Sequence, residues 1–187
     1  MVIYIYRGAY RDKREELIRT AVRTYAEEEQ RIDGAGLSGA PLLKTKDGKP
    51  YLEGFPVHFS ISHTGDMWGC LVSGSNVGFD IQKIKPVDFN RLAERFFPTE
   101  EIEFVRNVGI EGFFDVWTRK EACIKYFGGG LLRDIKSFSV IRDGKPVEMI
   151  DYSKNRCHIS SLELNEAVKC AHCCGTEGAR VWTREIT

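Results

Sequence analysis

One stretch, Trp117-Thr118-Arg119-Lys120-Glu121-Ala122-Cys123-Ile124-Lys125, decides how the rest of the sequence is interpreted. At helical pitch, five of its side chains fall along one stripe: Trp117, Lys120, Glu121, Ile124 and Lys125. A helix that only packed against a core would repeat aliphatic residues there, whereas this stripe mixes an indole, two ammonium groups and a carboxylate. The glycines at 128–130 are expected to end the helix. Two interpretations stay open, a surface helix with an ordinary Glu121–Lys125 ion pair and a functional face.

Composition and charge limit the classes of function that fit the sequence. The 187 residues are 42% hydrophobic, enough for a sizeable core in one domain or in two packed halves. Basic and acidic residues number 27 each, so no net charge attracts nucleic acid or an anionic membrane. No apolar run is long enough to span a membrane, and residues 1–6 are too short for a signal peptide. We therefore expect a cytoplasmic protein whose six cysteines are reduced.

The first part of the chain combines strands with one long helix. Period-two patterns and β-branched or aromatic residues predict strands at 2–6, 57–63, 68–73 and 77–83. Apolar residues at helical spacing predict a helix over about 12–31 with Asp12 as its N-cap. Residues 32–49 predict a loop with a turn at Asp47-Gly48. Basic residues crowd the start of the helix; most form a solvated face, and one or two could bind phosphate.

Two of the expected strands carry side chains that could bind phosphate or metal. Ser62 and His63 precede a glycine turn, where a hydroxyl and an imidazole can contact phosphate, although such pairs are common in turns. Asp80 and Gln82 lie two apart and therefore project to the same face of their strand. A carboxylate and an amide oxygen suit a hard cation such as magnesium. The alternative is the solvent-facing polar side of an edge strand.

The segment 83–86 breaks the strand pattern at Pro86 and divides the chain into an N-terminal half, 1–85, and a C-terminal half, 86–187. In the second half we expect helices at 90–97, 99–108 and 113–127, with Thr99 as an N-cap. Strands are expected at 137–141, 158–162, 167–173 and 179–183, with a hairpin turn at Asp143-Gly144.

A cluster of cysteine and histidine near the end of the chain invites a metal interpretation. Its members are Cys170, His172, Cys173 and Cys174. The cluster has no second cysteine or histidine pair at zinc spacing. Alternating side chains on a strand explain it more simply.

Several motifs, taken together in this order and spacing, resemble the 4′-phosphopantetheinyl transferase superfamily, in its larger single-chain type built from two similar halves. They are Gly48-Lys49-Pro50, Phe59-Ser60-Ile61-Ser62-His63, Gly78-Phe79-Asp80-Ile81-Gln82 with Lys85-Pro86, Arg95-Phe96-Phe97, and Trp117-x-x-Lys120-Glu121-Ala122-x-x-Lys125 with Gly130-Leu131. The resemblance covers most of 48–131 and, more loosely, 14–23 and the final strands. Each motif is modest alone, and together they are specific.

The resemblance implies an α+β fold, with two similar α/β halves whose antiparallel sheets pack as a pseudo-dimer around a cleft for coenzyme A and magnesium. It implies that the enzyme moves the phosphopantetheine arm of coenzyme A to a serine of an apo acyl or peptidyl carrier protein and releases adenosine 3′,5′-bisphosphate. We expect a monomer with no nucleic-acid or membrane partner. The sequence does not identify the carrier.

The resemblance also assigns roles to residues by their position in the motifs. Asp80 and Glu121 look like magnesium ligands, one from each half, and Gln82 is a third candidate. Glu121 is the implied base for the carrier serine, Lys125 would hold the pyrophosphate, and Lys120 could share that work. The implied coenzyme A contacts are Ser62 and His63 to phosphates, Lys49 and Pro50 to the adenine end, and Arg14 to the 3′-phosphate.

Two departures from the family pattern affect these roles. Much of the family has glutamate where this chain has Gln82, which removes one negative charge and is expected to weaken metal binding. The region before Gly48 lacks the family's longer basic segment, so the role of Arg14 is a hypothesis. A rival interpretation is a catalytically silent coenzyme A or carrier-protein binding module of the same fold. An unrelated nucleotide enzyme has no support, since the glycine-rich loops of such enzymes are missing.

Overall fold

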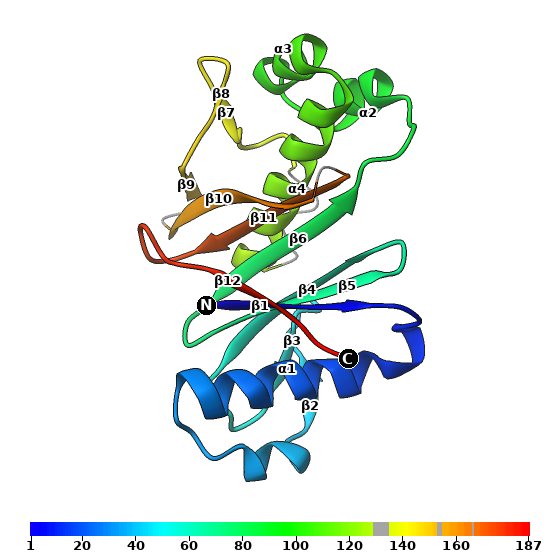
Figure 1. Cartoon of the computed structure of the whole chain (residues 1–187). Coiled ribbons are helices and arrows are strands. Elements are labelled where there is room, and N and C mark those ends of the chain that lie inside the picture. The colour runs from blue at the N-terminus through cyan, green and yellow to red at the C-terminus, as the bar shows by residue number, and fades with distance from the viewer. Residues whose placement is uncertain (129–134, 153–154, 166) are drawn as a thin grey trace.

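Two four-stranded sheets form the centre of the computed structural model, which describes residues 1–128, 135–152, 155–165 and 167–187 (Figure 1). The first sheet contains β1 (Val2–Arg7), β4 (His58–Thr64), β5 (Met67–Ser73) and β12 (Trp182–Glu185), and the second contains β6 (Val77–Lys83), β9 (Met149–Tyr152), β10 (Asn155–Asn165) and β11 (Val168–Cys174). Their spatial orders are β12-β1-β5-β4 and β6-β11-β10-β9. Pairing is antiparallel except between β1 and β12 in the described chain. The mixed α+β class with antiparallel sheets is confirmed.

The first sheet is covered by α1 (Arg14–Glu29), which confirms the predicted long helix. Its buried face consists of Leu17, Ile18, Ala21, Val22, Tyr25 and Ala26. The prediction of Asp12 as the N-cap was wrong. Asp12 lies inside a 3-10 turn, η1 (Arg11–Lys13), and Lys13 occupies the N-cap position without a side-chain capping bond.

Part of the loop expected at 32–49 is ordered as regular structure. It contains the 3-10 helix η2 (Gly34–Ser38) and the strand β2 (Leu42–Lys44), which pairs with β3 (Pro50–Leu52). The turn predicted at Asp47-Gly48 joins these two strands, and Gly48 has the positive φ of 85° that favours glycine. This β2–β3 hairpin becomes a wall of the candidate site.

The second sheet is covered by α2 (Phe89–Phe96), α3 (Thr99–Val108) and α4 (Ile110–Phe127). Helix α4 begins three residues before the predicted start and ends as expected, with Gly128 at the C-cap at a φ of 95°. The motif residues at 129–131 lie outside the described residues. The prediction of Thr99 as an N-cap was wrong, because Thr99 is the first residue of α3 and Pro98 occupies the N-cap position. Among the described residues, no helix is both long and apolar enough to cross a bilayer.

The strand predicted at 137–141 is much shorter in the structure. Only β7 (Ile141–Arg142) forms, paired with β8 (Lys145–Pro146) across the turn predicted at Asp143-Gly144. In the segment before β7, the carbonyl of Phe138 accepts a hydrogen bond of 2.5 Å from Lys120 Nζ, and the backbone N–H of Val140 donates to Glu101 Oε1 at 2.7 Å, so these backbone groups bond to side chains. The other three predicted strands form with shifted ends, as parts of β10, β11 and β12.

The chain crosses between the two sheets twice. The turn at 74–76 leads from β5 into β6, which pairs with β11 of the second sheet, and the end of the chain returns as β12 to pair with β1 (Figure 1). An apolar layer that includes Ile3, Leu71 and Phe79 packs between the sheets. A boundary at 85/86 therefore does not separate the two sheets, because β6 belongs to the second one.

A buried histidine on β11 makes stability depend on pH. His172 is 4% exposed, and burial, followed by the charges of Arg119 and the N-terminus, lowers its pKa from 6.5 to about 4. Between these pH values the unfolded chain binds a proton that the native chain excludes, so stability falls as pH drops. When the pH is lowered from 8 to 5, the proton excluded from His172 should reduce the free energy of unfolding by about 2 kcal/mol.

Urea unfolding at both pH values tests this prediction. The wild type should lose about 2 kcal/mol more than His172→Leu, because this substitution removes only this titration. Equal losses in the two proteins would show that His172 is not held neutral.

Candidate functional site

The site is built where β6 passes directly against α4. A Cβ atom on Gly78 of β6 would lie 1.9 Å from the carbonyl oxygen of Ala122 and 2.5 Å from the backbone nitrogen of Tyr126. Only glycine permits this approach, because both neighbours are backbone atoms. Asp80, two residues further along β6, is thereby placed on the side that faces α4.

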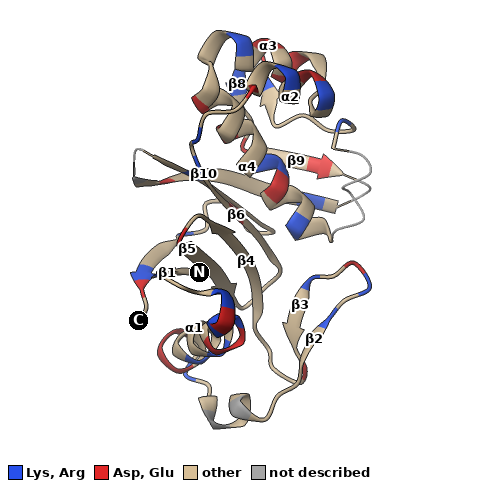
Figure 2. Cartoon of the chain, turned by 90° about the vertical axis from the view of Figure 1, so that its right-hand side faces the viewer, with Lys and Arg blue, Asp and Glu red and all other residues tan. Residues whose placement is uncertain are grey.

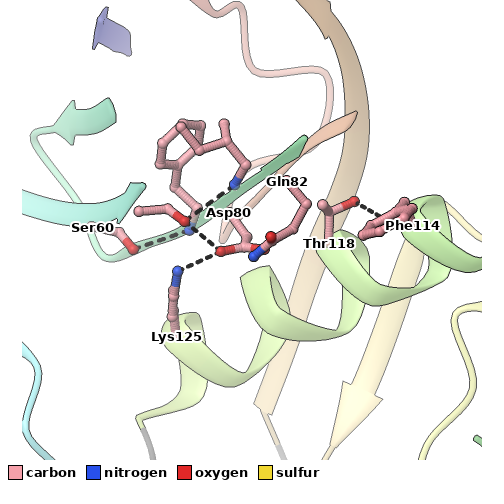
Figure 3. Close-up of polar contacts among 9 residues, drawn as sticks. Ser60, Asp80, Gln82, Phe114, Thr118 and Lys125 are labelled. Carbon is pink, nitrogen blue, oxygen red and sulfur yellow. Dashed lines mark hydrogen bonds and ion pairs between the residues drawn. The ribbon is translucent and has the colours of Figure 1, made fainter. Parts of the chain in front are cut away.

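Asp80 is a buried carboxylate held by three side chains. It is 2% exposed, and its Oδ1 accepts a hydrogen bond from Lys125 Nζ at 2.7 Å (Figure 3). The same oxygen accepts a hydrogen bond from Ser62 Oγ at 2.5 Å. Gln82 Nε2 donates to Oδ2 at 3.3 Å. The structure therefore joins Asp80, Gln82 and Lys125, which lie on two separate elements, and excludes the solvent-facing alternative for Asp80.

Hydroxyl side chains of β4 connect this strand to β6. Ser60 and Ser62 accept hydrogen bonds from the backbone N–H groups of Phe79 at 3.0 Å and Ile81 at 3.3 Å. Both serines are consequently buried, although they are the polar residues of the alternating pattern, whereas His58 and His63 of the same strand are exposed. Ser62 lies beneath Asp80, and Ser60 is the serine that lines the cleft.

Glu121 stands on α4 one turn before Lys125 and is partly buried. Burial and then the negative charge of Asp80 raise the pKa of Glu121, and Lys125 opposes them. Two carboxylates close enough to repel each other form a donor set that suits a hard divalent cation such as magnesium. Gln82, whose Nε2 faces Asp80 here, could add its amide oxygen if the amide turned. The residues present therefore fit the metal that the resemblance implies.

Lys120 is directed away from these residues, although the motif places it beside Glu121. It is fully buried, 3.0 Å from Glu101 Oε1, and donates to the carbonyl oxygens of Ile135 and Phe138 at 2.8 and 2.5 Å. Burial lowers the pKa of Lys120, and the adjacent Glu101 carboxylate raises it. The geometry gives Lys120 a structural position between α3, α4 and the segment before β7.

A cleft of about 510 Å³ opens beside Glu121 and Lys125. Its walls are the start of α1, the β2–β3 hairpin, β4 and the last turns of α4, and Figure 2 shows the charged segments of these elements. Four lining residues are cationic, Arg14, Lys44, Lys49 and Lys125, and three are acidic, Glu15, Asp47 and Glu121. The cleft therefore offers cations for the anionic groups of a ligand and carboxylates for a metal ion or a proton. A larger hollow of about 660 Å³, near Glu111 and Lys169, contains none of the predicted site residues.

Tyr10 links two of the predicted contact residues at the edge of the cleft. Its hydroxyl lies 3.0 Å from His63 Nδ1, and the Arg14 guanidinium lies 5.9 Å from the centre of its ring. Burial, then the charges of Arg14 and Lys125, lower the pKa of His63. Nothing in the sequence pattern marked Tyr10, because this contact joins the start of the chain to the end of β4.

Lys49 joins the β2–β3 hairpin to the body of the protein. Its Nζ donates to Asn76 Oδ1 and to the carbonyl oxygen of Val77, both at 2.6 Å. Burial lowers the pKa of Lys49 to about 8. Lys49 and Pro50 both line the cleft, as do Arg14 and Lys125. Of the residues predicted to contact coenzyme A, only Ser62 and His63 are not part of this lining.

Comparisons with known proteins show the family of the chain. The family model described as the 4′-phosphopantetheinyl transferase superfamily matches residues 76–174, which include β6 and α4. The 4′-phosphopantetheinyl transferase gsp of Aneurinibacillus migulanus is 34% identical over 137 residues, covering 70% of this chain and 56% of the relative. A 4′-phosphopantetheinyl transferase of Bacillus subtilis is 34% identical over 159 residues, covering 81% of this chain and 69% of the relative. The 4′-phosphopantetheinyl transferase Sfp of Bacillus subtilis (strain 168) is 33% identical over 133 residues, covering 67% of this chain and 59% of the relative. The matches thus span between about half and two thirds of these relatives.

Proposed function

The chain belongs to the 4′-phosphopantetheinyl transferase superfamily, and from this premise we propose that it transfers the 4′-phosphopantetheine arm of coenzyme A to a serine of an apo acyl or peptidyl carrier protein. The observation that carries the proposal is the meeting of Asp80, Glu121 and Lys125 beside a cleft whose wall also carries Arg14, Lys44 and Lys49. In the reaction, the serine oxygen forms a bond to the β-phosphorus, and the bond to the departing adenosine 3′,5′-bisphosphate breaks.

Each charged residue has a defined role in this proposal. Glu121 accepts the serine proton, because its carboxylate lies at the wall of the cleft, where the carrier serine would meet coenzyme A. Lys125 is 28% exposed, pairs with Asp80 and lines the cleft, so it would stabilise the negative charge of the pyrophosphate. Magnesium, held by Asp80, Glu121 and the Gln82 amide oxygen, would neutralise charge on the non-bridging oxygens.

The cleft walls provide the contacts to the rest of coenzyme A. Arg14 lies at the open edge of the cleft and would bind the 3′-phosphate, while Lys49 and Pro50 would contact the adenine end. His63, next to Tyr10, would contact a phosphate. Ser62 supports the site indirectly, through its hydrogen bond to Asp80.

The two sheets with their helices are proposed to be the two similar halves of a pseudo-dimer. Asp80 comes from chain segment 1–85 and Glu121 from segment 86–187, and both belong to the second sheet with its helices, because β6 pairs with β11. We propose a cytoplasmic monomer whose macromolecular partner is the carrier protein.

Transfer to a carrier is tested by intact-mass spectrometry of an apo acyl carrier protein after incubation with this chain, coenzyme A and Mg²⁺. The expected result is the gain of one phosphopantetheine, abolished by EDTA. If apo acyl and apo peptidyl carriers both stay unmodified while coenzyme A still binds, the chain is the silent binding module instead.

The role of Gln82 predicts the effect of adding a carboxylate. Gln82→Glu should lower the Mg²⁺ concentration for half-maximal activity by about tenfold, equivalent to ~1.4 kcal/mol, because the cation gains one negative ligand. Magnesium titrations of the wild type, Gln82→Glu and the distant control Gln30→Glu measure this. An unchanged magnesium requirement in Gln82→Glu would remove Gln82 from the ligand set.

The role of Arg14 predicts a change confined to substrate binding. Arg14→Ala should raise the KM for coenzyme A by about tenfold or more with little change in kcat, since a hydrogen bond to a charged group contributes ~1.5–3 kcal/mol. With 3′-dephospho-coenzyme A, the wild type and Arg14→Ala should be alike, and Arg23→Ala, an exposed change on the same helix, should behave as wild type. An equal rise in KM for both substrates would assign Arg14 to another part of coenzyme A.

A further inference from the structure

Three cysteines meet behind the catalytic face of α4. Cys123 lies on α4, Cys157 on β10 and Cys173 on β11, and each is 0% exposed. Their three sulfur atoms all lie within 4.8 Å of one another, and the Sγ atoms of Cys123 and Cys173 are 3.3 Å apart. Residues far apart in the sequence thus converge on one point, from a helix and two adjacent strands.

The ordinary explanation for buried cysteines is that they pack as small apolar side chains. All six cysteines are buried in apolar clusters, and Cys70, Cys170 and Cys174 fit this explanation, because none of them belongs to a group of three potential metal ligands in the described residues. The three thiols of the cluster instead face each other. A metal–sulfur distance of about 2.3 Å requires sulfur atoms roughly 3.8–4.0 Å apart around one ion, which small side-chain shifts here would provide.

The number of ligands selects the kind of metal. Within the described residues, the group of potential ligands at this point consists of these three thiols, without a fourth histidine, cysteine or carboxylate. Structural zinc sites almost always have four ligands, whereas soft thiolates alone also select Cu⁺. Magnesium and calcium are excluded, because they require oxygen ligands.

One buried cation lies near the three thiols. The guanidinium of Arg119, one helical turn before Cys123, interacts electrostatically first with Asp115 and then with Cys123 and Cys173. Three thiolates with one Cu⁺ carry two negative charges, of which this cation would offset part. It donates to Ser161 Oγ at 2.8 Å and to the Val147 carbonyl, but its Nε has no hydrogen-bond partner in the described structure. Burying an unpartnered N–H is costly unless it faces negative charge.

We propose that Cys123, Cys157 and Cys173 form a binding site for one Cu⁺ ion, held by three sulfur atoms between α4 and the second sheet. Binding exchanges thiol protons for the metal, so protons are released to solvent and no electron is transferred. The ion would tie α4, which carries Glu121 and Lys125, to β10 and β11.

The test is a titration of the reduced, metal-free protein with Cu⁺ under anaerobic conditions, in competition with the chromophoric chelator bicinchoninate. We expect one Cu⁺ per chain and an X-ray absorption spectrum with a first shell of three sulfur atoms. Cys157→Ala and the more conservative Cys157→Ser should each lose at least about tenfold in affinity, the loss that follows removal of even an outer partner of a metal site.

The matched controls are Cys70→Ala and Cys170→Ala, which remove buried thiols outside the cluster and should bind Cu⁺ as the wild type does. The proposal is overturned if the wild type binds no Cu⁺ against the chelator, if the controls lose affinity as much as the Cys157 variants, or if the spectrum shows oxygen or nitrogen ligands only. The titration needs neither coenzyme A nor a carrier, so its failure is distinct from a failure of the transferase proposal.

Discussion

Glu121→Gln is expected to reduce the rate of phosphopantetheine transfer by about 10²–10⁴-fold, the usual contribution of a positioned general base. The amide keeps the size of the side chain but cannot accept the serine proton, and it removes one of the two charges that would hold magnesium. Coenzyme A should still bind, because the cations of the cleft are unchanged. The measurement is the initial rate of mass gain on an apo carrier, together with a coenzyme A titration.

The control for this change is Glu111→Gln, on the same helix. Glu111 is exposed, and its ion pair with Lys169 at 3.3 Å lies outside the cleft, so its removal should leave the transfer rate unchanged. If Glu121→Gln retained more than a tenth of the wild-type rate, another group would have to accept the proton.

Two lysines on α4 should respond in opposite ways to the same substitution. Lys120→Met leaves Glu101 buried without its partner, and breaking a buried pair in this way costs about 3–5 kcal/mol of folding stability. Lys125→Met removes a partly exposed cation from the cleft, so it should reduce transfer strongly and stability much less. Urea unfolding and the transfer rate per folded molecule separate the two effects.

The double variant Lys120→Met with Glu101→Gln provides the internal check. Removing both charges should restore part of the stability lost in Lys120→Met, because no uncompensated charge stays buried. If Lys120→Met kept wild-type stability and lost transfer activity, Lys120 would belong to the catalytic machinery despite its position.

The predictions from sequence were most accurate where one pattern filled a whole element. Strand 77–83 and helix 99–108 have the predicted bounds, because alternation and helical spacing are local properties. The pairing of β6 with β11 was not predictable, since it depends on which distant strand offers a matching edge. Burial of Ser60 and Ser62 was missed for the same reason: their partners are backbone groups of another strand.

The sequence predicted which residues belong to the candidate site better than it predicted the directions of their side chains. Adjacent residues on a helix point about 100° apart, so the sequence could not show that Glu121 faces the cleft while Lys120 faces Glu101. The cysteine cluster illustrates the same limit. Spacing along 170–174 gave no metal pattern, and the three thiols that meet come from 123, 157 and 173.

The central claim is that the junction of β6 and α4 is a phosphopantetheinyl transfer centre. The most direct measurement is mass spectrometry of both products of one reaction containing this chain, an apo carrier protein, coenzyme A and Mg²⁺. The account predicts that carrier bearing phosphopantetheine and free adenosine 3′,5′-bisphosphate appear in equal amounts, and that neither appears with Asp80→Asn. Equal product formation by the wild type and folded Asp80→Asn would contradict it.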